Sequence, residues 1–103
     1  MAGTILINET GGVALNSFGY HRIIEAIRGE FSEGEADVRS AIYEGNDLAC
    51  MNFISVKEQD AAGFQIFERA ALAAYEKAEQ HGQTFSEWDE LLARLAADTR
   101  SLR

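Results

Sequence analysis

Two consecutive apolar stripes after residue 60 place the strongest constraint on the fold of this chain. The first comprises Phe64, Phe67, Ala71, Ala74, Tyr75 and Ala78, and the second comprises Phe85, Trp88, Leu91, Leu92 and Leu95. Spacings of three and four residues put each stripe on one helix face. Asp60 and the Thr84-x-x-Glu87 capping box mark the helix starts, and Gly82 marks a stop between them. The short link predicts two antiparallel neighbouring helices, and Trp88 is the aromatic residue most expected to border a groove.

The N-terminal third begins with a different hydrophobic period. Ile5, Leu6 and Ile7 are consecutive and precede a Gly-Gly pair, which predicts a strand covered on both faces and then a turn. Residues 13–16 are the candidate second strand of a hairpin. Residues 18–31 return to helical spacing, with Asn16 or Ser17 as the N-cap.

Residues 32–47 allow two interpretations. Ser32-x-x-Glu35 matches a capping box, which would open a short helix ending at Gly45. Alternatively, residues 37–43 form a strand that turns into residues 48–56. We favour the hairpin, with residues 48–56 as a central strand.

The order of these elements predicts an α+β fold: a small, mainly antiparallel sheet with helices packed on one face, ending in an antiparallel helix pair. The chain has 103 residues, no proline and no repeat, so we expect a single domain over residues 1–103. Ile42, Leu48 and Cys50 are expected to point into its core.

Composition limits the compartment and the chemistry. One cysteine, Cys50, excludes an intrachain disulfide and suits a reducing cytoplasm, and no apolar run approaches the length of a membrane span. We therefore expect a cytoplasmic protein. His21 and Glu25 stand at i and i+4, but no third ligand follows at a telling spacing, and Cys50 has no neighbouring base. The sequence thus predicts no metal, no cofactor and no enzymatic activity.

Charge is concentrated in the middle of the chain. The net charge is −8, and residues 29–60 hold eight acidic against two basic side chains. Nucleic acids and anionic membranes are poor partners for such a chain, whereas a basic protein is permitted. The acidic residues that open the last predicted helix complement its dipole, but those of the middle segment have no such local role.

The leading functional hypothesis is a small protein-binding module that docks a basic partner through this acidic segment. Its specific form is an immunity or antitoxin-type inhibitor of a basic toxin such as a nuclease, a class that this chain resembles in size and acidity. The predicted partner-binding residues are Glu33, Glu35 and Asp37 for charge steering, and Tyr43, Glu44 and Asp47 for contact at a turn. Tyr43 is the first residue to test, because tyrosine is frequent at binding hot spots. The alternative is a homo-oligomeric structural or adaptor protein, such as a homodimer, assembled through the C-terminal helices.

Overall fold

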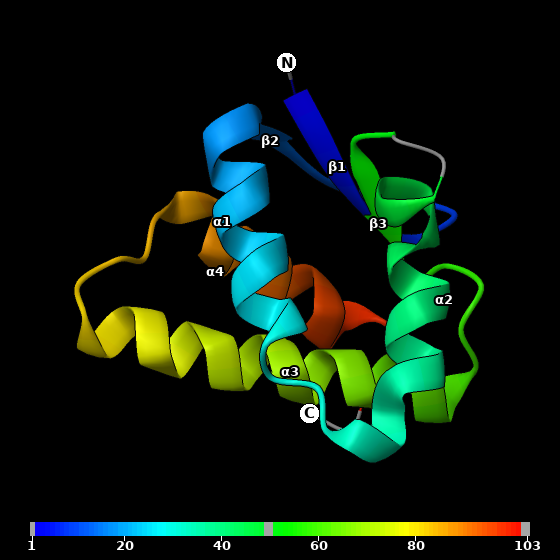
Figure 1. Cartoon of the computed structure of the whole chain (residues 1–103). Helices are drawn as coiled ribbons and strands as arrows, with labels where there is room; N and C mark the ends of the chain where they lie inside the picture. The colour runs from blue at the N-terminus through cyan, green and yellow to red at the C-terminus, as the bar shows by residue number, and fades with distance from the viewer. Residues whose placement is uncertain (1, 49–50, 102–103) are drawn as a thin grey trace.

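The computed structural model describes residues 2–48 and 51–101 (Figure 1). In chain order the elements are β1 (Ala2–Asn8), β2 (Gly11–Asn16), α1 (Ser17–Arg28), the short 3₁₀ helix η1 (Glu33–Glu35), α2 (Ala36–Asp47), β3 (Phe53–Ser55), α3 (Ala61–Gln80) and α4 (Ser86–Ala97). The α+β prediction is confirmed.

The sheet is mixed and has the strand order β2-β1-β3. β1 and β2 form the predicted antiparallel hairpin, in which Ile5 lies opposite Val13. β3 pairs with β1 in parallel, with Ile5 opposite Ile54. The prediction of a central strand over residues 48–56 is wrong, because β1 occupies the centre and β3 is a short edge strand. Parallel pairing requires a long crossover, and α1, η1 and α2 supply it.

Residues 36–47 form helix α2, so the favoured hairpin is wrong and the alternative helix is correct. The Ser32–Glu35 capping box is present: the Glu35 side chain accepts a hydrogen bond from the Ser32 backbone N–H. Ile42 is buried, one helical turn after the partly buried Val38, and this spacing suits one helix face.

Helices cover one face of the sheet and leave the other partly open. On the covered face Ile5, Ile7 and Val13 are buried, and a Cβ on Gly3 would overlap the ring of Tyr20 from α1. On the opposite face Leu6 is only half-buried, so the expectation that both faces of β1 are fully covered is only partly met.

One continuous core joins β1, β2, β3 and all four of the described α-helices. Ile42 belongs to it as predicted, but Leu48 is 78% exposed, and its predicted place in the core is wrong. Leu48 is the C-cap of α2, so its side chain leaves the helix beyond the last buried turn. Cys50 lies outside the described residues.

α4 turns back across α3, as expected for a helix pair with a short link (Figure 1). The Tyr75 and Trp88 rings meet edge to face, with centroids 5.9 Å apart. Asp60 caps α3 by accepting from the N–H of Gly63, and Gly82, which follows the C-cap of α3, begins the link in a left-handed conformation, φ 66°. The predicted Thr84 cap is wrong, because Phe85 is the N-cap of α4 and no side chain caps it.

The residues after α4 fasten the C-terminal segment to the sheet. The guanidinium group of Arg100 donates hydrogen bonds to the backbone carbonyls of Ile7, Val56 and Gln59. It also donates to both carboxylate oxygens of Asp98. One side chain therefore ties β1, the segment after β3 and the chain end together.

Candidate protein-binding surface

The solvent side of α2 carries acidic side chains that have no partner among the residues the structure describes. Asp37 and Glu44 are exposed on this helix, and Glu33 is exposed at the start of η1. None of these three side chains takes part in a hydrogen bond or ion pair among the described residues, so their charge faces solvent. Figure 1 shows α2 on the outer flank of the molecule. We name Glu33, Asp37 and Glu44 the acidic face.

Two other predicted partner-binding residues, Glu35 and Asp47, already form hydrogen bonds within the protein. Glu35 closes the capping box and pairs with Arg69 of α3, and these hydrogen bonds, first that from Ser32, lower the pKa of the Glu35 carboxyl. Asp47 accepts two hydrogen bonds from Arg28, at 2.8 and 2.9 Å, which lower the pKa of the Asp47 carboxyl. The prediction that these acids lack a local structural role is therefore wrong for Glu35 and Asp47. A partner protein would have to compete with bonds that these carboxylates already make. That prediction is also wrong for Asp37, which lies in the first turn of α2, where a negative charge complements the helix dipole.

Tyr43 is fully buried, so its predicted place as an exposed contact at a turn is wrong. It lies on the inner face of α2, where its hydroxyl donates to the backbone carbonyl of Ile24 in α1. The guanidinium carbon of Arg28 lies 4.4 Å from the centroid of the Tyr43 ring and covers it. Burial raises the pKa of the Tyr43 hydroxyl far above its usual range. Tyr43 joins two helices of the core and offers no surface to a partner.

A groove of about 460 Å³ runs beside the acidic face, between α2 and the open face of the sheet. Leu6 and Phe53 contribute apolar surface, and Glu44 and Glu58 contribute negative charge, with Lys57 nearby. Phe53 packs closely on Gly45, since a Cβ there would lie 2.5 Å from the ring. Sequence reasoning missed this groove, because the hairpin interpretation paired residues 37–43 with the sheet.

Exposed apolar side chains occur at the same end of α2. Leu48 is 78% exposed and Met51 is 54% exposed, on either side of the two undescribed residues. Large exposed apolar side chains are typical of contact surfaces when they adjoin polar residues. The remaining large apolar side chain that is exposed among the described residues is Phe18 of α1, so neither C-terminal helix presents one to a second copy of the chain.

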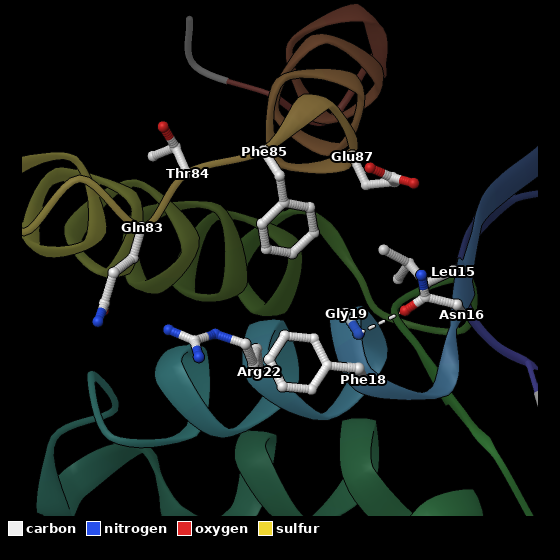
Figure 2. Close-up of a pocket in the computed structure, with 9 residues that line it drawn as sticks. All are labelled: Leu15, Asn16, Phe18, Gly19, Arg22, Gln83, Thr84, Phe85 and Glu87. Atoms are coloured by element: carbon white, nitrogen blue, oxygen red, sulfur yellow. Dashed lines mark hydrogen bonds between the residues drawn. The ribbon is translucent and has the colours of Figure 1, made fainter.

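A second pocket lies between the start of α1 and the link before α4 (Figure 2). Phe85, rather than the expected Trp88, borders it, and Trp88 is only 2% exposed. This pocket contains none of the predicted site residues.

The catalytic and metal-binding candidates are not brought together. Glu25 pairs with Arg28 at 3.0 Å, whereas His21 is exposed and packs edge to face on Tyr20. Within residues 2–48 and 51–101, no group of three or more His, Cys, Asp and Glu side chains is arranged to hold a metal ion. No helix in the described part of the chain has both the length and the apolarity needed to cross a membrane.

Comparison with known proteins relates the fold of this chain to a solved structure. No protein-family model matches the chain, and no curated protein matches its sequence. A solved structure matches with a TM-score of 0.85 and 19% sequence identity, over 95% of this chain and 97% of the matched chain. That structure is a CdiA-CT toxin from Burkholderia pseudomallei E479 in complex with its cognate CdiI immunity protein. The chain thus has the fold of one protein of a toxin–immunity complex.

Proposed function

We propose that this protein is an immunity-type inhibitor that binds a basic toxin in the cytoplasm. The observation that carries the proposal is the likeness to a chain from a toxin–immunity complex at a TM-score of 0.85. Of the two roles in such a complex, the inhibitor suits a chain with a net charge of −8, because an acidic protein complements a basic partner.

The acidic face and the neighbouring groove are the surface on which the partner docks. Glu33, Asp37 and Glu44 carry charge that is unpaired within residues 2–48 and 51–101, and the groove beside them offers apolar surface at Leu6 and Phe53. Charge in this arrangement accelerates encounter, and apolar surface supplies contact area that slows dissociation. Exposed Leu48 extends the apolar part at the end of α2.

The test pairs this protein with a toxin domain encoded next to its gene. Co-expression should restore the growth of cells that produce the toxin, and calorimetry with the two purified proteins should give a saturable 1:1 complex. If a neighbouring toxin is neither bound nor neutralised, the inhibitor proposal is wrong.

Two triple variants, each of which removes three negative charges, test whether the acidic face is the docking surface. Glu33→Gln, Asp37→Asn and Glu44→Gln together neutralise the acidic face, while Glu9→Gln, Glu76→Gln and Glu79→Gln neutralise three exposed acids elsewhere. Neither set removes an ion pair of the described residues. We expect the first triple to weaken binding by roughly tenfold or more and the second by much less. Equal losses would mean that only net charge matters and that the acidic face is not the docking surface.

A further inference from the structure

The pocket at the start of α1 has the size and lining of a small-molecule site. Its volume is about 390 Å³, within the range of pockets that hold small ligands. Phe18 of α1 and Phe85 before α4 approach it from different elements and contribute two aromatic rings (Figure 2). In Figure 1 the starts of α1 and α4 lie away from α2, so this pocket is separate from the acidic face.

The inner wall of the pocket is fixed by local structure. Asn16 caps α1 by accepting from the N–H of Gly19 at 2.7 Å, which holds the first turn in place. The Phe85 ring packs on Gly19, where a Cβ would lie 3.3 Å from the ring edge. Buried Trp88 follows one turn later and donates its backbone N–H to the carbonyl of Phe85 at 3.0 Å. The pocket therefore exists before any ligand arrives.

The polar side chains at the Arg22 end of the pocket suit a negatively charged group. Arg22 lies over the Phe18 ring, with 5.3 Å between the guanidinium carbon and the ring centroid, and it forms no ion pair among the described residues. Glu87 carries a negative charge in the same lining, but it lies on the Leu15 and Asn16 side of the pocket, across from Arg22 (Figure 2). Gln83 and Thr84 line the same pocket and add an amide and a hydroxyl donor. Arg22, Gln83 and Thr84 thus place a cation and two polar side chains at one end of the pocket, away from the Glu87 carboxylate.

We propose that this pocket binds a small aromatic carboxylate, with the ring against Phe18 and Phe85 and the carboxylate on Arg22. An arginine fork matches the two oxygens of a carboxylate, and stacked rings suit a flat apolar body. Phe18 is 70% exposed in the free protein, and a bound ring would cover part of it. This site is independent of the proposed inhibitor function.

The test uses 2-naphthoate as the probe and 2-naphthamide as its neutral counterpart. Titration into the ¹⁵N-labelled full chain should give saturable NMR shifts confined to residues 15–22 and 83–87, with a Kd on the order of 1 mM or lower. The neutral amide should bind more weakly. Equal binding of both probes, or shifts centred on another part of the chain, would overturn the proposal.

Three single variants assign the roles within the pocket. Arg22→Gln should weaken 2-naphthoate binding by roughly three- to tenfold, because an exposed charge-assisted bond is lost. Phe18→Ala should weaken both probes, and it should leave the fold intact because this side chain is exposed. Arg39→Gln on α2 removes the same charge elsewhere and should have little effect.

If Arg22→Gln and Arg39→Gln bind 2-naphthoate equally well, the carboxylate site is wrong. If neither probe binds, but Phe18→Ala and Arg22→Gln weaken the complex with a partner protein, the pocket is a protein contact and the small-ligand proposal fails. The spectra of each variant, recorded without probe, establish that it is folded.

Discussion

At the residue scale, Tyr43 shows how a side chain favoured at interfaces can serve the core instead. We expect Tyr43→Phe to lower the free energy of unfolding by about 1 kcal/mol, because one buried hydrogen bond to the carbonyl of Ile24 is lost. Tyr43→Ala should cost about 3–5 kcal/mol, since it also leaves a cavity. Urea unfolding followed by circular dichroism measures both values. A Tyr43→Ala variant as stable as the unchanged protein would contradict the buried position.

The consequence for binding experiments is direct. A loss of partner affinity in Tyr43→Ala would report unfolding as readily as a lost contact. Glu44→Gln is the cleaner probe on the same helix, because Glu44 is exposed and unpaired among the described residues.

Asp98 makes the free energy of unfolding depend on pH in the acidic range. Its side chain is 5% exposed, and hydrogen bonds from Arg100 hold the pKa of the Asp98 carboxyl well below its ordinary value of 3.8. As the pH falls, the unfolded chain takes up this proton first, so the contribution of Asp98 is complete above about pH 3.8 and is lost below it. Asp98→Asn should therefore be less stable at neutral pH, and it should lose less stability between about pH 5 and pH 2.

Unfolding free energies measured across that pH range test this prediction. Glu44→Gln is the control, because the Glu44 side chain is exposed and forms no hydrogen bond or ion pair with the described residues. An acid dependence that is the same in Asp98→Asn and in the unchanged protein would rule out this role for Asp98.

At the element scale, the close packing of α2 against the sheet depends on the absence of a side chain at Gly45. An added Cβ would lie 2.5 Å from the Phe53 ring, so Gly45→Ala must displace that ring or the helix. Overpacking of this kind costs about 1–3 kcal/mol, which offsets or exceeds the gain of about 1 kcal/mol that alanine brings to a helix interior. We expect a net loss of stability and altered chemical shifts along β3.

Gly34→Ala in η1 is the matched control, because an added Cβ there meets nothing within 4 Å. Its unfolding free energy should change by less than about 0.5 kcal/mol, or rise slightly. A Gly45→Ala variant more stable than Gly34→Ala would show that α2 does not rest on Phe53.

At the scale of the whole molecule, the net charge of −8 should govern how fast a basic partner arrives. If the inhibitor proposal holds, the association rate should fall by roughly tenfold or more as salt is raised from about 0.05 to 0.5 M, because screening shortens the reach of the field. The dissociation rate should change much less. Stopped-flow mixing measures both rates, and a salt-independent association rate would contradict electrostatic steering.

Local sequence signals located most elements and the β1–β2 hairpin, but not the pairing of β3. Asn16 and Asp60 cap the helices that they were predicted to cap, because a capping bond spans only three residues. The partner of β3 could not be predicted from sequence, because a parallel pair is joined by a long crossover, and the packing of that crossover against the sheet decides which strand becomes the neighbour.

The candidate site was predictable only in its charge. Glu33, Asp37 and Glu44 are exposed and unpaired among the described residues, as an acidic docking edge requires, but whether they bind a partner stays a prediction. In the sequence, Glu35 and Asp47 cannot be told apart from these three acids. In the structure, Glu35 pairs with an arginine 34 residues away in the chain, and Asp47 pairs with one 19 residues away.

The sequence by itself determined the α+β class, the helix stripes and the concentration of negative charge, because periodicity and composition are local properties. Only the tertiary structure decided that Tyr43 is buried, that Leu48 is exposed and that Phe18 and Phe85 border one pocket. Those outcomes depend on contacts between distant segments. The stabilising free energy of these arrangements comes from burial and close packing against specific neighbours. The spacing of residues along the sequence does not identify those neighbours.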